Sequence, residues 1–186
     1  MIALILGVLL WWAAHLTKRL APGPRAALQD RMGDASKGLF ALLIVLSVVL
    51  MTLGYQNYTG QFFWGRNAVL VGINNLLMLA AVYLFAASGA RTRVTKFIRH
   101  PQLTAFKAWA VAHILVNGDT ASFILFGGLL IWAVVEVIVI NRQTERPVPA
   151  ETYPVKKEVT AIVAAVVVFG LVSAIHIWLG YNPFGA

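Results

Sequence analysis

The sequence predicts an all-α integral membrane protein, a polytopic helical bundle with about six transmembrane helices. Of its 186 residues 60% are apolar and only 12% are charged, about half the charged fraction of a soluble domain. The apolar residues form long runs, several of them near the ~20 residues that cross a bilayer as a helix. These runs lack the alternation of membrane β-strands. We therefore expect one integral membrane domain over residues 1–186 with little mass outside the bilayer.

Six apolar segments are the expected membrane helices. They are Ile2–Thr17, Gly38–Gln56, Ala68–Ser88, Gln102–Val116, Ala121–Ile140 and Val159–Leu179. The first and fourth are short for a full crossing, so each should cross a thinned region or stop within protein. The Pro-Gly-Pro sequence at residues 22–24 breaks the chain after the first segment. Asn-Gly-Asp at residues 117–119 predicts a tight turn, which makes the fourth and fifth segments an antiparallel hairpin.

The basic residues predict the orientation in the membrane. Thirteen of the fifteen Lys and Arg residues fall in three connections on one side of the expected bundle. They are Lys18, Arg19, Arg25, Arg31, Lys37, Arg91, Arg93, Lys96, Arg99, Arg142, Arg146, Lys156 and Lys157. The positive-inside rule makes that side cytoplasmic, so both termini should be non-cytoplasmic. Because these residues follow the ends of apolar spans, the net charge of +8 favours the lipid bilayer, not nucleic acid, as the partner.

The stretch from Arg99 to Gly118 is the first candidate for a functional site. It has the composition of a membrane helix but contains His100, Lys107 and His113, and ionisable groups inside a membrane normally face protein, a cavity or a ligand. His113 lies twelve residues after Pro101, about 18 Å along a helix. Either it is hydrogen-bonded across a helix interface, or it is an axial ligand to iron.

The other three histidines have boundary positions. His15 ends the first span beside Trp11 and Trp12, which suit either a membrane interface or the face of an aromatic macrocycle. His176 lies near the far end of the last span, where an interfacial role is expected. His100 directly precedes a proline, which predicts a capping position at a helix start, with an acid–base or phosphate-contact role as the alternative. The absence of cysteine excludes disulfides, thiolate metal sites and cysteine nucleophiles.

Two charged residues lie inside the expected spans. Lys107 and Glu136 are each six residues from the basic-side end of their segments, so their depths match at about 9 Å. An ion pair is the expected arrangement, because an unpaired charge in a bilayer is costly. The alternative is a lysine whose long side chain extends to the interface.

Two long stretches resemble the signature of the NnrU family of bacterial membrane proteins: RHPQLTAFKAWAVAHILVNGD and the following SFILFGG. The family pattern reads R-H-P-x-L, then W-x-x-A-H-L-x-x-N-G-D, then S-x-x-L-F-G-G. The resemblance continues at Trp12–His15, at Arg25 and Gly33, and in the closing HIWLGYNPF. Ala105 and Lys107 depart from the pattern expected at their positions.

This resemblance implies a helical protein of the bacterial inner membrane that is associated with nitrite and nitric oxide reduction in denitrifying bacteria. The family also looks related to plant zeta-carotene isomerases, which bind b-type haem through two histidines. By motif, His15 and His113 match those metal ligands. The residues that would contact the cofactor are Trp12, Trp109, Arg25, His100 and the two ligands. The protein would then be a haem-dependent isomerase or a redox protein, with a hydrophobic small-molecule substrate or a redox partner.

The expected depths of the histidines in the membrane do not fit a simple choice of two haem ligands. By helical rise, His15 lies about 6 Å from the basic side, His113 about 18 Å and His176 about 28 Å. Since both axial ligands must meet one iron, their depths must nearly agree, and rise alone does not choose between His15 and His176. Two other functions stay open. One is a non-enzymatic accessory or assembly protein of a reductase system. The other is a membrane methyltransferase, although Glu145–Arg146 stands where such enzymes usually carry a glutamate pair.

Overall fold

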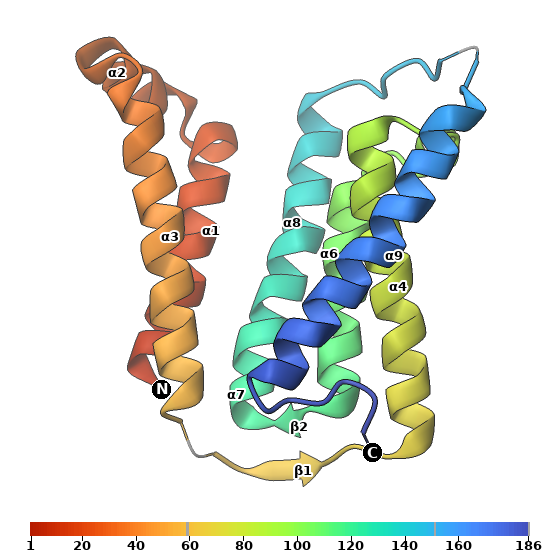
Figure 1. Ribbon diagram of the computed structural model, residues 1–186. Coiled ribbons are helices and arrows are strands. Elements are labelled where there is room, and N and C mark those ends of the chain that lie inside the picture. The colour runs from red at the N-terminus through yellow and green to blue at the C-terminus, as the bar shows by residue number, and fades with distance from the viewer. Residues whose placement is uncertain (59, 151, 186) are drawn as a thin grey trace. The chain divides into compact units, whose positions relative to one another are not determined.

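The computed structural model describes residues 1–58, 60–150 and 152–185, which are mostly helical (Figure 1). Its elements in chain order are α1 (Ile2–Leu20), α2 (Pro22–Met32), α3 (Ala35–Gln56), β1 (Phe62–Trp64), α4 (Ala68–Ala90), α5 (Val94–Phe97), α6 (Pro101–Val116), β2 (Gly118–Asp119), α7 (Thr120–Ser122), the π-helix η1 (Phe123–Gly127), α8 (Gly128–Gln143) and α9 (Val155–Trp178). The chain forms two compact units. Unit 1 contains residues 1–62 and 119–132, and unit 2 contains residues 63–118 and 133–186.

Five of the six predicted membrane helices are confirmed as long apolar helices. Five stretches are long and apolar enough to cross a membrane: Ile2–Leu20, Ala35–Gln56, Ala68–Ala90, Thr120–Gln143 and Val155–Trp178. The sixth predicted segment is α6, which has 16 residues and is short for a crossing. Large apolar side chains stay exposed along these helices, such as Leu42 on α3 and Val166 on α9, as a lipid-facing surface requires. The chain is an all-α integral membrane protein, and its description as one domain over residues 1–186 stays a prediction.

Two local features differ from the sequence-based expectation. The segment after α1 continues as helix α2, with Pro22 in its first turn. Proline breaks a preceding helix but fits the first turn of the next one, where its missing N–H has no helical partner. The chain also has two short strands, β1 and β2, which form a two-stranded sheet, although no strand was expected.

Close contact between α1 and α3 holds much of unit 1 together. A Cβ atom added at Gly54 of α3 would lie 2.3 Å from the backbone nitrogen of Leu4. A Cβ atom added at Gly7 of α1 would lie 2.7 Å from the backbone nitrogen of Met51 and 2.8 Å from the carbonyl oxygen of Ser47. Glycine at both positions therefore lets the two backbones touch, as is common where membrane helices cross.

A directed hydrogen-bond chain links the end of α3 to α7 within unit 1. The Ser122 hydroxyl, which is fully buried, donates to Asp119 Oδ2 at 2.8 Å, and Tyr55 Oη lies 2.9 Å from the same hydroxyl oxygen. Because a serine hydroxyl has one proton, the tyrosine must be the donor in the second bond. Asp119 also accepts the backbone N–H of Ser122 at 2.9 Å and so caps α7.

Unit 2 is built on α4, which packs against α6 and α9. Alanines fill these contacts, each at most 2% exposed: Ala81, Ala87, Ala105, Ala110, Ala112, Ala161 and Ala165. Small side chains let membrane helices approach closely. The C-terminal segment returns to the start of α4 (Figure 1), where Arg66 Nη2 donates to the Asn182 carbonyl at 2.7 Å and Asn75 Nδ2 donates to the Pro183 carbonyl at 3.2 Å.

The close α1–α3 contact predicts that alanine substitution of two glycines in α3 changes the free energy of unfolding in opposite directions. Gly54→Ala should lower the free energy of unfolding by about 1–3 kcal/mol, as overpacking does. Gly38→Ala should raise it by up to about 1 kcal/mol, because a Cβ there meets nothing within 4 Å and alanine favours helix. Equilibrium unfolding in detergent measures both changes. A Gly54→Ala protein as stable as Gly38→Ala would contradict the close crossing.

Candidate histidine site

Three histidines in the apolar helices share one hydrogen-bond geometry. In each, Nδ1 lies 2.8–2.9 Å from the carbonyl oxygen of the residue four positions earlier. The pairs are His15 with Trp11, His113 with Trp109, and His176 with Val172. A carbonyl oxygen can only accept, so Nδ1 carries the proton and Nε2 carries the lone pair. This is the tautomer that a metal-binding histidine usually has, with its other nitrogen donating to a backbone carbonyl.

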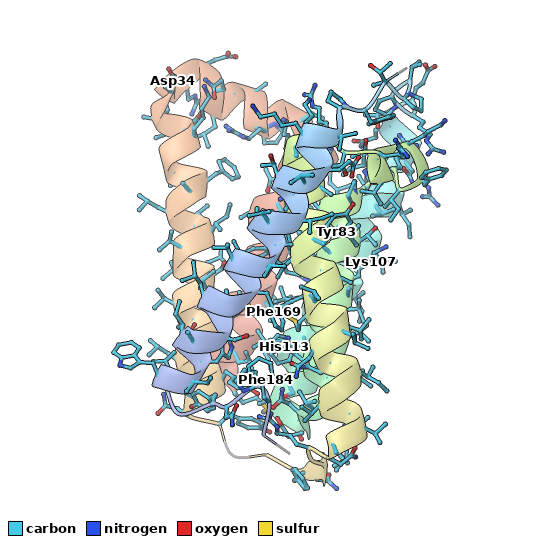
Figure 2. The ribbon with its side chains drawn as sticks, turned by 45° about the vertical axis from the view of Figure 1, so that its right-hand side comes forward. Asp34, Tyr83, Lys107, His113, Phe169 and Phe184 are labelled. Carbon is cyan, nitrogen blue, oxygen red and sulfur yellow. The ribbon has the colours of Figure 1, made fainter. Side chains whose placement is uncertain are left out.

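In unit 2, His113 lies at the end of a row of aromatic rings on α6. Its ring centroid is 5.0 Å from that of Trp109, which is 5.0 Å from that of Phe106. His176 of α9 is close enough to interact electrostatically with His113, although helical rise alone placed the two at different depths. Figure 1 shows α9 running obliquely across unit 2, and helical rise alone takes no account of such a tilt. Figure 2 shows His113 among the side chains between α9 and α4.

In unit 1, His15 is surrounded by indole rings. Its centroid lies 4.1 Å from that of Trp11, with the rings tilted by 30°, and 4.9 Å from that of Trp132, which meets it edge-on. Sequence reasoning missed Trp132, because nothing in the fifth span marks which of its apolar residues faces α1. The expected macrocycle wall Trp12 instead donates its indole N–H to the Gly128 carbonyl at 3.1 Å.

An apolar groove of about 320 Å³ also lies on α1. It is lined by Trp12, Ala13, Leu16, Thr17, Leu20 and Ala21. Since successive helical residues are about 100° apart, this set lies on a different side of α1 from His15. The groove is therefore no pocket for a group bound to His15.

The two remaining predicted cofactor contacts have structural partners. Arg25 donates to the Ser36 hydroxyl at 3.2 Å, and its guanidinium lies 4.3 Å from the centre of the Phe40 ring, so it holds α2 on α3. His100 occupies the predicted N-cap position of α6 but makes no side-chain cap bond. Its Nε2 instead lies 2.8 Å from Asn141 Oδ1, which joins the start of α6 to the end of α8 as an antiparallel hairpin requires.

The structure thus places His113, Trp109 and His176 in unit 2, whereas His15, Trp12 and Arg25 belong to unit 1. The pairing of His15 with His113 stays a prediction. Within residues 1–58, 60–150 and 152–185, no group of three or more His, Cys, Asp or Glu side chains could hold a metal ion. A haem iron does not require such a group, because the porphyrin supplies four ligands and the protein one or two.

Comparison with known proteins gives the family. A family model described as NnrU protein matches residues 3–183, nearly the whole chain. The chain belongs to the NnrU family. Neither a curated protein nor a solved structure matches it.

The NnrU signature residues after His113 end α6 inside the protein. Asn117 Nδ2 donates to the His113 carbonyl at 2.8 Å, and Trp64 Nε1 donates to the Leu115 carbonyl at 3.1 Å. A Cβ atom at Gly118 would lie 2.3 Å from the Trp64 ring, so this position needs glycine. The His113 carbonyl also accepts the Asn117 backbone N–H at 3.0 Å, whereas Trp64 gives the Leu115 carbonyl a partner that the end of a helix otherwise lacks.

The expected ion pair between Lys107 and Glu136 is wrong. Among the residues that the structure describes, Lys107 has no carboxylate within 4.0 Å. Figure 2 shows Lys107 at the outer edge of unit 2, apart from His113. Matched depth in two helices does not fix the side of the helix on which each residue lies. The partly exposed Lys107 instead fits the alternative, in which its side chain extends to the interface.

We predict that Lys107→Met changes the free energy of unfolding by less than about 0.5 kcal/mol, as for an ordinary surface substitution. Breaking a buried ion pair would instead cost about 3–5 kcal/mol. As a positive control on the same helix, Ala105→Leu should destabilise by about 1–3 kcal/mol, because Ala105 is fully buried. Equilibrium unfolding in detergent distinguishes the two cases. A large decrease in the free energy of unfolding for Lys107→Met would show that Lys107 takes part in a buried ion pair after all.

Proposed function

We propose that this NnrU-family protein binds a b-type haem and uses His113 as an axial ligand. The observation that carries the proposal is the 2.9 Å bond from His113 Nδ1 to the Trp109 carbonyl. It gives Nε2 the lone pair that iron requires and fixes the plane of the ring. The adjacent Trp109 and Phe106 rings supply flat apolar surface of the kind that lines cofactor sites.

Two histidines qualify as the opposite ligand. The family resemblance names His15, whose Nδ1 makes the same backbone bond. His176 is the alternative within unit 2, because it also has this geometry and lies close enough to His113 to interact with it electrostatically.

When bound, haem supplies one-electron redox chemistry. The histidines would hold the iron, and the aromatic rings on α6 would exclude water from it. The family's association with nitrite and nitric oxide reduction makes a redox role in that system, in the bacterial inner membrane, the proposed function. With the basic loops on the cytoplasmic side, both termini would lie outside the cytoplasm.

Visible spectroscopy of protein purified with ample haem supply tests the proposal. We expect a Soret band and sharp reduced bands in the wild type. His113→Ala should lose most of the haem while the protein still folds, and added imidazole should restore part of it by supplying the missing ligand. Lys107→Met, on the same helix, should keep a wild-type spectrum.

The second ligand is identified by the same measurement on His15→Ala and His176→Ala. The true opposite ligand, once removed, should give a five-coordinate spectrum, while the other variant stays six-coordinate. A folded wild-type protein without haem under these conditions would refute the proposal, as would a His113→Ala protein with an unchanged spectrum.

A further inference from the structure

The end of unit 2 at which α4 leaves and α6 begins carries a dense group of cations, here called the unit 2 basic patch. Its members come from the connection between α4 and α6, from the end of α8 and from the start of α9. They are Arg91, Arg93, Lys96, Arg99, Arg142, Arg146, Lys156 and Lys157. In Figure 1 the α4–α6 and α8–α9 connections lie at the same end of the unit.

Hydrogen bonds join these segments into one surface. Arg146 Nη2 donates to the Lys96 carbonyl at 2.8 Å, and Arg99 Nη2 donates to the Thr144 carbonyl at 2.6 Å. These two bonds hold the loop after α8 against the α4–α6 connection. The backbone N–H of Arg93 donates to the Glu158 carboxylate, which brings the first turn of α9 and its two lysines to the same place.

Positive charge exceeds negative charge in the segments that form the patch. The sequence has three acidic residues in these segments, Glu145, Glu151 and Glu158, so the eight cations exceed the carboxylates by five. In the described part of the chain, none of the eight forms an ion pair within 4.0 Å. The Glu158 carboxylate accepts a backbone N–H. Such a surplus of cations attracts anions from outside the protein.

The position of the patch indicates which anion. It lies where α4 ends at Ala90 and α6 begins at Pro101, at the level where helices leave the hydrocarbon core. Between them, the short helix α5 exposes 71% of Phe97, and an exposed aromatic residue beside cations is typical of a membrane interface. Binding of a nucleic acid or a free anion would not explain why Phe97 is exposed beside the cations. Binding of a lipid explains both, because its phosphate attracts the cations and its acyl chains accommodate the ring.

The backbone turns at Arg91 into the cation-rich connection. Arg91 has φ of 55°, and no other non-glycine residue in the described part of the chain has a positive φ. Arg91 is the C-cap of α4, and its backbone N–H donates to the Ala87 carbonyl, as is common where a helix ends on a left-handed residue. Here this conformation ends α4 sharply and turns the chain into the cation-rich connection.

We propose that the unit 2 basic patch binds the phosphate headgroups of anionic phospholipids, with Phe97 inserted at the level of the acyl chains. The proposal is independent of haem binding. Its residues lie at the basic end of the helices, and none of them is a histidine of the candidate site.

The test is native mass spectrometry or fluorescence titration of the intact protein in neutral detergent, with phosphatidylglycerol and phosphatidylcholine as the probes. The test variant is the triple substitution Arg91→Gln, Lys156→Gln and Lys157→Gln. The matched control is Lys18→Gln, Arg31→Gln and Lys37→Gln, which removes three exposed cations from unit 1. Circular dichroism melting verifies that each protein is folded.

We expect phosphatidylglycerol to bind more tightly than phosphatidylcholine. Loss of each patch cation should weaken it about fivefold, hence on the order of 100-fold for the triple variant, with a much smaller change for the control. Phe97→Ser should weaken lipid binding with every charge intact. Equal affinity for the two lipids, or equal losses in the test and control triples, would overturn the proposal. Inorganic phosphate that displaces the lipid at equal concentration would assign the patch to a free anion instead.

Discussion

Polar groups in a bilayer must find their hydrogen-bond partners within the protein, and the details of this structure follow from that constraint. Each of the three histidines in the apolar helices bonds to the carbonyl one turn earlier. Side chains of Asn117 and Trp64 bond the last carbonyls of α6. The same requirement that makes these bonds necessary for stability also sets the histidine tautomer. The chemistry available at Nε2 is therefore a consequence of how the helices satisfy Nδ1.

Close packing of small residues is the second condition for this arrangement. Hydrophobic burial does not drive helices together in lipid, so association depends on contact between backbones and on polar bonds. Gly7 and Gly54 supply that contact in unit 1, and the alanines of α4, α6 and α9 supply it in unit 2. The Ala105 departure from the family pattern is accommodated, since this residue is fully buried in the α6 contact. Large apolar side chains are left for the lipid-facing surface.

Hydropathy predicted the spans well, because the bilayer itself sets their length and composition. The expected Gly38–Gln56 became Ala35–Gln56, and the expected Gln102–Val116 became Pro101–Val116. Features that depend on the side of a helix could not be predicted this way. Helical rise gave equal depths for Lys107 and Glu136, but it did not show on which side of its helix each side chain lies. It also separated His113 from His176, because it contains no helix tilt.

The candidate site was predicted in part for the same reason. His113 was identifiable because an ionisable residue in an apolar run requires an explanation, and Trp109 was added by the family resemblance. Trp132 gives no such signal, since a tryptophan in a membrane helix is ordinary until its neighbour is known. Arg25 was identifiable only through the family resemblance, and sequence alone does not place its partner Ser36 beside it. His100 was identifiable from its position before a proline, and its partner Asn141 lies where the predicted hairpin of the fourth and fifth segments would bring it.

The central claim is that His113 offers an Nε2 lone pair because Nδ1 donates to the backbone. Solid-state ¹⁵N NMR of the haem-free protein in bilayers, with labelled histidine and His113→Gln for assignment, measures this tautomer directly. The account predicts that the His113 signal shows a protonated Nδ1 and an unprotonated Nε2. A signal with the proton on Nε2, or a doubly protonated imidazolium at neutral pH, would contradict it.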